Sequence, residues 1–494
     1  MTRGGAILGL LLLARTAAAA VPPVPIPEGP DANSVPAFLG APAVPHRILA
    51  PRIPQHPFMA PNGRSNVHDD AYMTDTYVGS GPLGRMPEAH STFQAAECGS
   101  VTFDSAGRIV TICVGVEGPE LVLIDAQTLE TDAVMPLPPR SPPSPGSSIF
   151  SDFSGGGYFY LDQLDRAVIP TNNRQIWVVG ETESPIGPGF ALLRTYDLSS
   201  AVALGDGIVS VLPDWHGLLW FVTVHGLVGT VEPASGALAV LGLGGEAIGN
   251  SFAVDETGGV FIVSDHALYR FDAGPNGAPL VTWRETYDRG TRLKPGQVNF
   301  GSGTTPTLMG RSWVAITDNA DPRMNVLVYR RAAVVSGPRL FCTEPVFAAG
   351  MSATENSLIG VGTRSLVVEN NYGYSGPAVT ENGGTTEPGV TRVDLGTSGC
   401  RTVWTSAERV PSTVSKVSLG AGLVYTYTKD PEPNNTDAWY FTAIDFRTGQ
   451  TVYKRRAGTG LGFNNNFAPV TLGPDGTAYV GALGGLVQIR DAQP

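Results

Sequence analysis

Lysine is scarce in this sequence: four lysines occur among 494 residues, and Asp, Glu, Lys and Arg together make up only 15%. Helical proteins draw heavily on Lys, Glu, Ala and Leu, so this composition disfavours a helical fold. The formal net charge of −12 argues against nucleic acid as a partner, because nucleic-acid affinity depends on Lys and Arg side chains that neutralise phosphates.

Long apolar runs and reactive-cysteine motifs are also missing. After the first twenty residues no stretch reaches the roughly 20 apolar residues that a membrane span needs, so we expect none. The four cysteines form no Cys-x-x-Cys pair, which removes the usual spacing of redox and zinc sites. No Gly-x-Ser-x-Gly, Walker or His-Glu-x-x-His motif occurs, so the sequence names no reaction.

The first twenty residues have the pattern of a secretory signal peptide. A basic start at Arg3 precedes a short apolar run, residues 6–14, and small residues end the segment at Ala20. We predict a signal peptide over residues 1–20 and a mature protein that is secreted or periplasmic. Residues 21–96 follow as a lead-in whose first forty residues are rich in proline, which predicts an extended segment that is poorly ordered or lies along the surface.

The whole chain contains 61 glycines and 41 prolines, which favour tight turns. From Cys98 onward, such turns separate short strand-like segments. A short apolar strand that runs into an acidic or polar residue recurs eight times, at intervals of 35 to 72 residues between the copies' last residues. That interval suits a four-stranded unit with loops of variable length. The eight copies are residues 121–125, 194–197, 229–232, 268–272, 326–329, 390–394, 442–445 and 487–491.

These repeats predict an all-β fold, a β-propeller of eight four-stranded blades over residues 97–494. Seven blades stay an alternative because the copies ending at Asp197 and Tyr329 are weak, and a pair of β-sandwiches is the other architecture. The last copy has no strand after it, so we expect a strand upstream of Cys98 to complete the final blade and close the ring.

Four cysteines in an exported chain predict two disulfides. If Asp104–Gly107 form a hairpin turn, residues whose numbers sum to 211 face each other, which places Cys98 opposite Cys113. Cys342 and Cys400 then remain and would have to join consecutive blades.

Residues 443–453 carry the Ala-x-Asp-x-x-Thr-Gly pattern followed by an aromatic residue, Tyr453. This stretch resembles the blade motif of quinoprotein-type propellers, in which the aromatic residue is Trp. The resemblance covers roughly residues 98–491 and implies a fold and an exported location. Quinoprotein dehydrogenases also hold a quinone with a calcium or lanthanide ion and stack the quinone on a disulfide between adjacent cysteines, which this chain lacks.

Polar clusters at residues 317–321, 354–357, 369–372 and 464–466 supply the candidate site. Carboxylate and amide oxygens are the ligands that a hard cation prefers, and they also bind sugar hydroxyls. Turn formation is the alternative role of the same residue types. The predicted ligand-binding residues are Asp318, Asn319, Glu355, Asn356, Glu369 and Asn370, with Asp318, Glu369 and Asn370 as ligands of a candidate Ca²⁺ ion.

The leading hypothesis is an exported monomer that binds a small polar molecule or saccharide in an axial funnel, with or without a divalent cation and with catalysis left open. The alternatives are a non-catalytic scaffold of the cell envelope and a degenerate quinoprotein-type oxidoreductase. Residues 66–75 could cover one mouth of the ring and add His68 or Asp70 to a site, or form a solvated loop.

Overall fold

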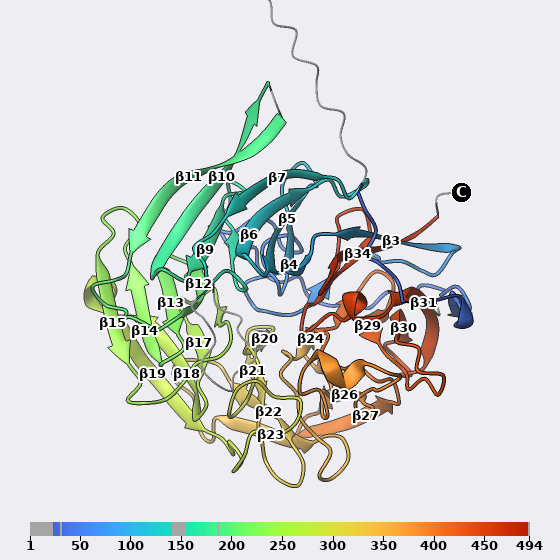
Figure 1. Cartoon of the computed structure of the whole chain (residues 1–494). Coiled ribbons are helices and arrows are strands. Elements are labelled where there is room, and N and C mark those ends of the chain that lie inside the picture. Colours follow the sequence, from blue (N-terminus) through green and yellow to red (C-terminus); the bar gives the residue numbers. More distant parts are fainter. Residues whose placement is uncertain (1–22, 30–31, 141–154, 186, 493–494) are drawn as a thin grey trace, which may run out of the picture.

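The computed structural model describes residues 23–29, 32–140, 155–185 and 187–492, which form a ring of β-sheets around a central axis (Figure 1). Eight sheets follow one another around this ring, so the protein is an eight-bladed β-propeller and the predicted fold is confirmed. The predicted signal peptide, residues 1–20, lies outside the described residues. Within the described ranges the helical elements are short 3-10 turns: η1 (Ala32–Ser34), η3 (Pro275–Gly277), η4 (Pro377–Thr380) and η5 (Leu461–Phe463).

Each blade is an antiparallel sheet whose strands follow one another from the axis outward (Figure 1). Blade 1 is β4 (Ala96–Phe103), β5 (Ile109–Gly115), β6 (Gly118–Ile124) and β7 (Thr131–Pro136). Blade 2 is β8 (Tyr160–Leu161), β9 (Ala167–Thr171), β10 (Gln175–Ser184) and β11 (Gly187–Asp197). Blade 3 is β12 (Ile208–Pro213), β13 (Leu219–Thr223), β14 (Leu227–Val231) and β15 (Leu238–Gly242). Blade 4 is β16 (Ala253–Val254), β17 (Val260–Val263), β18 (Ala267–Ala273) and β19 (Pro279–Thr286).

The second half of the ring repeats this plan. Blade 5 is β20 (Thr307–Met309), β21 (Trp313–Thr317), β22 (Asn325–Arg330) and β23 (Leu340–Pro345). Blade 6 is β24 (Ile359–Val361), β25 (Ser365–Glu369), β26 (Val390–Leu395) and β27 (Cys400–Ser406). Blade 7 is β28 (Lys416–Ser418), β29 (Leu423–Thr428), β30 (Ala438–Asp445) and β31 (Thr451–Thr459). Blade 8 is β32 (Val470–Leu472), β33 (Ala478–Ala482), β34 (Gly485–Asp491) and an N-terminal strand, β3 (Pro87–Phe93).

The middle strands are continuous apolar runs because a neighbouring blade covers each of their faces. All four residues of β17, Val-Phe-Ile-Val, are buried, whereas the outermost strand β7 has no buried residue. Apolar side chains of adjacent blades meet between the sheets, as where Trp220 of blade 3 lies 6.4 Å from Phe271 of blade 4 between ring centroids. The core is therefore a set of layers between blades, stabilised mainly by the burial of apolar surface.

One aspartate turn joins the first and second strands in each of the first four blades. The Asp255 N–H donates to the Gly259 carbonyl, and the Asp255 Oδ1 accepts from the Gly259 N–H. Gly258, the residue before, has φ of +83°, a left-handed conformation that glycine adopts without steric cost. The same side-chain bond to the fourth residue along the chain is made by Asp104, Asp162 and Asp214.

Strand β3 closes the ring. It pairs antiparallel with β34 along its whole length, from Pro87 opposite Asp491 to Phe93 opposite Gly485. The Asp491 carboxylate also accepts hydrogen bonds from the backbone N–H groups of Leu83 and Arg85. The predicted closing strand upstream of Cys98 is confirmed, and it joins the N-terminal region to β34 of the last blade.

The proline-rich lead-in lies along the surface of the ring. β1 (Phe38–Gly40) pairs with β31 and extends blade 7 outward by a strand. Further along, the backbone N–H groups of Ala41, His46 and Ile48 donate to carbonyls of the ring. Of the two alternatives that the sequence offered, this segment takes the surface-bound one.

Residues 59–77, here called the axial segment, run across the ends of the innermost strands near the axis. Its last residues form β2 (Thr76–Tyr77), which pairs in parallel with β28 of blade 7. Its carbonyl groups accept backbone hydrogen bonds from one blade after another. The donor residues are Phe103 of blade 1, Leu161 of blade 2, Val254 of blade 4, Leu308 of blade 5, Gly360 of blade 6 and Val417 of blade 7.

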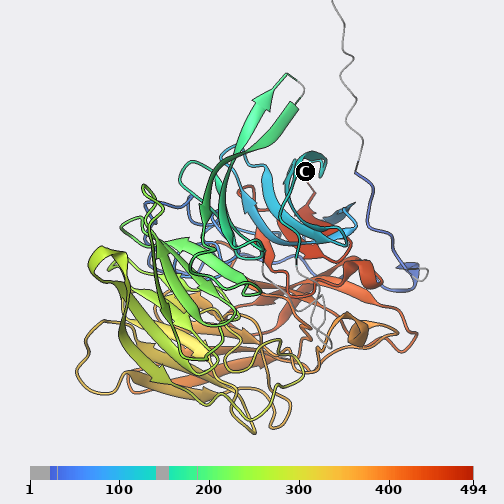
Figure 2. The same cartoon turned by 60° about the vertical axis from the view of Figure 1, so that its left-hand side comes forward.

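One copy of the predicted repeat is out of phase. Seven copies lie in the third strand of their blades, but the copy at residues 194–197 lies in β11, the fourth strand of blade 2. The third strand there is β10, which forms a long hairpin with β11 that rises from the ring (Figure 2). The blade count is unaffected, because blade 2 is present with four strands.

Both predicted disulfides form, Cys98 with Cys113 and Cys342 with Cys400, although the predicted hairpin register is one residue wrong. Beside the turn, Phe103 pairs with Ile109, a sum of 212. A β-bulge at Gly99 absorbs the extra residue and brings Cys98 opposite Cys113, where the numbers do sum to 211.

Loop length should rank the two disulfides by their contribution to stability. We expect the Cys98→Ala/Cys113→Ala variant to lose about 3 kcal/mol, because its disulfide closes a 15-residue separation, and Cys342→Ala/Cys400→Ala to lose about 4 kcal/mol for 58 residues. Urea unfolding of the oxidised variants and the wild type measures both losses. Equal stability of all three proteins would contradict the chain-entropy explanation.

Candidate functional site

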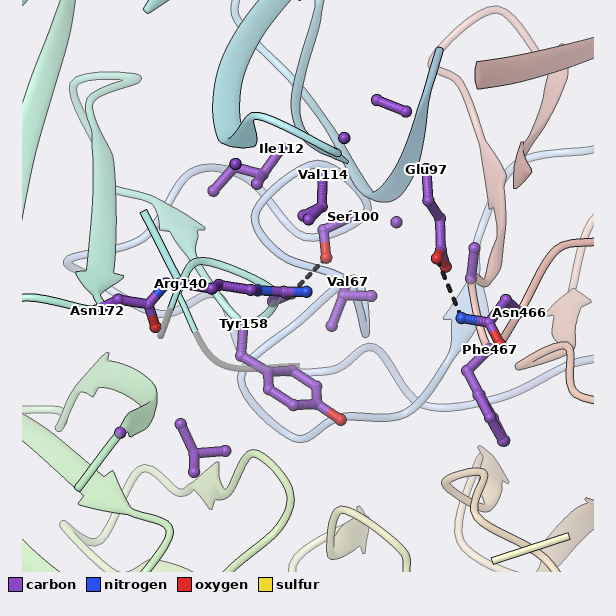
Figure 3. Close-up of a pocket in the computed structure, with 18 of the residues that line it drawn as sticks. Val67, Glu97, Ser100, Ile112, Val114, Arg140, Tyr158, Asn172, Asn466 and Phe467 are labelled. Atoms are coloured by element: carbon purple, nitrogen blue, oxygen red, sulfur yellow. Dashed lines mark hydrogen bonds between the residues drawn. The ribbon is translucent and has the colours of Figure 1, made fainter. Parts of the chain in front are cut away.

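A cavity of about 1390 Å³ lies on the axis, on the face where the chain enters the innermost strands (Figure 3). Most of its polar lining comes from residues that lie in or shortly before the first strand of a blade, so nearly every blade contributes. Val67 and His68 of the axial segment also line it and close it from the opposite side. The polar and aromatic residues that precede or begin the first strands are Glu97, Ser100, Tyr158, Asp206, Asn250, Asn299, Glu355, Asn356, Ser357, Asn466 and Phe467.

Glu97, at the start of β4, is one of two carboxyl groups of this cavity with a strongly shifted pKa. Burial raises the pKa of Glu97 to about 8, while a hydrogen bond from Asn466 Nδ2 at 3.1 Å and the charge of Arg140 act in the opposite direction. Figure 3 shows Glu97 and Asn466 facing each other across the lining. Glu97 is therefore mostly protonated at pH 7 and can donate a hydrogen bond.

Glu355, which precedes β24, is the second such carboxyl. Burial raises its pKa to about 8. The backbone N–H groups of Val298 and Asn299 and the Asn299 side chain donate to the carboxyl oxygens, and these hydrogen bonds lower the pKa by a smaller amount. Asn371 holds Thr354 and Glu355 in place, since its Oδ1 accepts hydrogen bonds from the Glu355 N–H at 3.0 Å and from Thr354 Oγ1 at 2.9 Å.

Tyr158 supplies an aromatic surface beside these groups. Its hydroxyl donates to Asn250 Oδ1 at 3.0 Å, and its ring stacks on the His68 ring with centroids 6.2 Å apart. Burial raises the pKa of Tyr158 well above its usual range, so the hydroxyl stays a donor at every physiological pH.

The structure divides the six sequence-predicted residues into three groups, of which the buried Glu369 forms the last. Glu355 and Asn356 line the cavity. Asp318, Asn319 and Asn370 follow the second strands of blades 5 and 6 and fasten loops. Asp318 accepts from the backbone and side chain of Asn325, and the amide groups of Asn319 and Asn370 each donate to two backbone carbonyls.

Glu369, at the end of β25, is fully buried behind the lining. Its Oε1 accepts from the Ser415 N–H at 2.8 Å, while Oε2 has no hydrogen-bond partner in the described part of the chain. Burial raises the pKa of Glu369 to about 7. The predicted contact of Glu369 with a ligand stays a prediction.

Sequence reasoning missed most of the lining, including Glu97, Arg140, Tyr158, Asp206 and Asn250. The missed signal is positional: a polar or aromatic side chain stands within a few residues of the first strand of successive blades. These residues escaped the sequence analysis because each has few polar neighbours in the sequence, whereas the predicted site residues all belong to clusters of polar residues.

The described residues do not fit the quinone and cation that the quinoprotein resemblance implies. Cys98–Cys113 and Cys342–Cys400 each join residues of two different strands, 15 and 58 positions apart, so neither offers the disulfide of adjacent cysteines on which a quinone stacks. Among the residues described here, no three His, Cys, Asp or Glu side chains gather as a metal site. The candidate Ca²⁺ ligands Asp318 and Asn370 are instead engaged with their own loops.

Within the described ranges no helix is long and apolar enough to cross a bilayer.

No protein-family model matches the chain. An uncharacterised protein of Archaeoglobus fulgidus is 26% identical over 323 residues, which cover 59% of this chain and 62% of that protein. The chain thus spans less than two thirds of this relative's length, and the relative brings no activity with it.

Several solved β-propellers are similar in shape. BamB from Moraxella catarrhalis matches 65% of this chain and 93% of its own at 13% identity, with a TM-score of 0.36. A streptogramin B lyase matches 82% and 97% at 10% identity, with a TM-score of 0.40. The WD40 domain of Doa1 matches 66% and 88% at 11% identity, with a TM-score of 0.36. Likenesses this remote carry no argument about function.

The buried Glu369 should make stability depend on pH. Its native pKa of about 7 exceeds the ordinary 4.5, so between these pH values the folded state keeps a proton that the unfolded state has released. The free energy of unfolding therefore falls as the pH rises from about 4.5 through 7. We expect Glu369→Gln to raise the free energy of unfolding by about 2–3 kcal/mol at pH 8 and to change it little at pH 4.5. Urea unfolding at both pH values measures this, and a pH-independent effect would contradict it.

Proposed function

We propose that this protein binds a small, uncharged polar molecule of the saccharide type in the axial cavity. The observation that carries the proposal is the pair of carboxyl groups, Glu97 and Glu355, whose pKa values are both raised to about 8 by burial. At neutral pH such groups are mostly uncharged and offer a hydroxyl donor beside a carbonyl acceptor.

The rest of the lining supports a hydroxylated ligand. Asn250, Asn299 and Asn356 add amide groups, which both donate and accept, and these match the dual character of an alcohol. Tyr158 and Phe467 add aromatic faces that can cover the C–H surface of a sugar ring. The cavity volume of about 1390 Å³ exceeds the usual 300–1,000 Å³ of small-molecule sites, so more than one sugar ring fits.

We also propose that binding takes place outside the cytoplasm, with the protein acting as a monomer. Two disulfides fit an oxidising compartment, and the signal-like residues 1–20 supply the means of export. The quinoprotein-type pattern at residues 443–453 spans β30 and β31, which supports a distant relation of the blades to that group without its cofactor.

A scaffold role is the second candidate, and one surface favours it. The β10–β11 hairpin stands out from the ring (Figure 2) and exposes Leu192 and Leu193, with relative accessibilities of 42% and 56%. Exposed apolar side chains on a protruding hairpin suit contact with a protein partner. Leu192→Ser/Leu193→Ser would abolish partner binding but leave ligand binding in the cavity intact.

The first test is a screen of purified protein, taken from its exported location, against mono- and oligosaccharides by native mass spectrometry and calorimetry. For a saccharide that binds, we expect Tyr158→Ala and Glu97→Leu each to weaken affinity about tenfold, the size of one lost aromatic or hydrogen-bond contact of about 1.4 kcal/mol. Asp318→Asn is the matched control, because Asp318 fastens a loop outside the lining.

A cation found by metal analysis of the same sample would restore the predicted Ca²⁺ site. Failure of every saccharide to bind would contradict the proposal and shift the function to the hairpin surface.

A further inference from the structure

Five exposed apolar side chains line the axial cavity and are here called the apolar rim: Phe93, Val116, Leu204, Val224 and Leu461. Val116 and Val224 stand in the turns between the second and third strands of blades 1 and 3. Leu204 and Leu461 stand in the connections that lead into blades 3 and 8, and Phe93 ends β3. Because strand direction alternates within a blade, all five positions lie on one face of the ring, the face that holds the cavity.

The local structure does not explain why Val116 and Leu204 are apolar. Val116 is fully exposed in a two-residue hairpin turn, a position that favours Gly, Asn or Asp. Leu204 is 88% exposed, whereas Leu198 and Val202 of the same connection are buried and anchor it. Since the ring buries neither Val116 nor Leu204, the apolar surface of both is available to a ligand.

The apolar rim continues inward along β5. Ile112 and Val114 both line the cavity and lie on one face of this strand, because side chains two positions apart share a face (Figure 3). Val116 follows at the same spacing, and exposure rises from the buried Ile112 through the half-buried Val114 to Val116. An apolar wall therefore extends from the interior of the cavity to its mouth.

Polar groups line the other side of the ring. The apolar rim spans the part of the ring from blade 7 through blades 8, 1 and 2 to blade 3, whereas Asn250, Asn299 and Glu355 precede the first strands of blades 4, 5 and 6. Asn250 and Glu355 are buried, so they lie deeper than the exposed rim. A cavity with hydroxyl-binding groups inside and apolar side chains at its mouth matches a ligand with two chemically different parts.

We infer that the ligand is amphipathic, with an apolar group that packs on the apolar rim and a hydroxylated part that reaches the polar groups inside the cavity. Its chemical class is a glycoside that carries an apolar aglycone, as alkyl glycosides and glycolipids do. The inference rests on the proposed binding function and narrows it, because a free sugar would leave the apolar rim uncovered.

A membrane surface and a protein partner match the apolar rim less well. The net charge of −12 and the burial of all four lysines disfavour contact with anionic lipid headgroups. A stable protein partner covers about 800 Å² of surface on each side. The apolar rim instead surrounds a concave site, which is the usual shape of a small-molecule site.

Methyl NMR of the wild-type protein tests the apolar rim directly. The probe is octyl β-glucoside below its critical micelle concentration, and methyl β-glucoside is the matched compound without the chain. We expect the octyl compound to shift the methyl resonances of Val116, Leu204 and Leu461 far more than the methyl compound does. Leu49, which is also 88% exposed but does not line the cavity, is the internal control. No shift at the rim, or equal shifts at the rim and at Leu49, overturns the inference.

Calorimetry supplies the second test. Wild type should bind octyl β-glucoside at least about tenfold more tightly than methyl β-glucoside, because the octyl chain buries apolar surface. Leu204→Ser should weaken octyl β-glucoside binding about fivefold and leave methyl β-glucoside binding within about twofold of wild type. Leu49→Ser is the matched control, since it replaces an equally exposed leucine outside the cavity, and it should bind both compounds as wild type does. Equal affinity of wild type for the two glucosides, or an unchanged octyl affinity of Leu204→Ser, contradicts the inference.

Co-sedimentation with phosphatidylcholine vesicles identifies the source of the ligand. Binding only to vesicles that contain a dialkyl glucoside indicates a membrane glycolipid, and binding to neither kind of vesicle indicates a soluble glycoside. Both results agree with an amphipathic ligand. Equal binding to plain vesicles means that the apolar rim inserts into the bilayer, and the inference is then wrong.

The two proposals fail in different ways. If a saccharide binds in the screen but the octyl chain adds no affinity and shifts no rim methyl group, this inference is wrong while the proposed function stands. If no saccharide binds but octyl β-glucoside and 1-octanol shift the rim equally, the apolar subsite is confirmed and the saccharide proposal is wrong. Should Leu204→Ser fail to fold, the NMR experiment on the wild type still decides.

Discussion

Closure of the ring by the N-terminal part of the chain is the constraint on which the rest of the structure depends. A propeller stays closed only if its last blade finds its missing strand, and β3 provides that strand to β34. The axial segment then accepts hydrogen bonds from the inner strands of six blades, so one stretch of chain holds the ring at its outer edge and near its axis. The site inherits its rigidity from this arrangement, because the same segment is its floor.

This arrangement places charged groups where water cannot reach them. Lys416 and Asp75 are completely buried and stabilise each other, while Asp69, Glu355 and Glu369 respond to burial through raised pKa values. Removal of one partner of a buried pair leaves an uncompensated charge, so such clusters tie the axial segment to the ring as well as shaping the cavity. All four lysines of the chain are buried, so the exposed cationic side chains among the described residues are arginines.

The site could be predicted only in part, and particular residues show why. Glu355 and Asn356 were found because they stand in a polar cluster, and both line the cavity. Asp318 and Asn370 stand in similar clusters but hold loops, since side-chain oxygens that satisfy backbone groups look the same in a sequence as oxygens that bind ligands. Glu97 sits in a strand with no polar cluster around it, and nothing local distinguishes it from a solvated glutamate.

The sequence by itself determined the all-β class, the blade repeat and the need for a closing strand, because these follow from local periodicity, turn residues and chain connectivity. Only the tertiary structure decided the rest. The bulge at Gly99 and the out-of-phase copy at Asp197 depart from the regular repeat. The meeting of His68 with Tyr158 and Glu355 on one axis depends on how blades far apart in the chain pack around a common centre. No local pattern encodes that convergence, since each blade contributes only one or a few side chains to it.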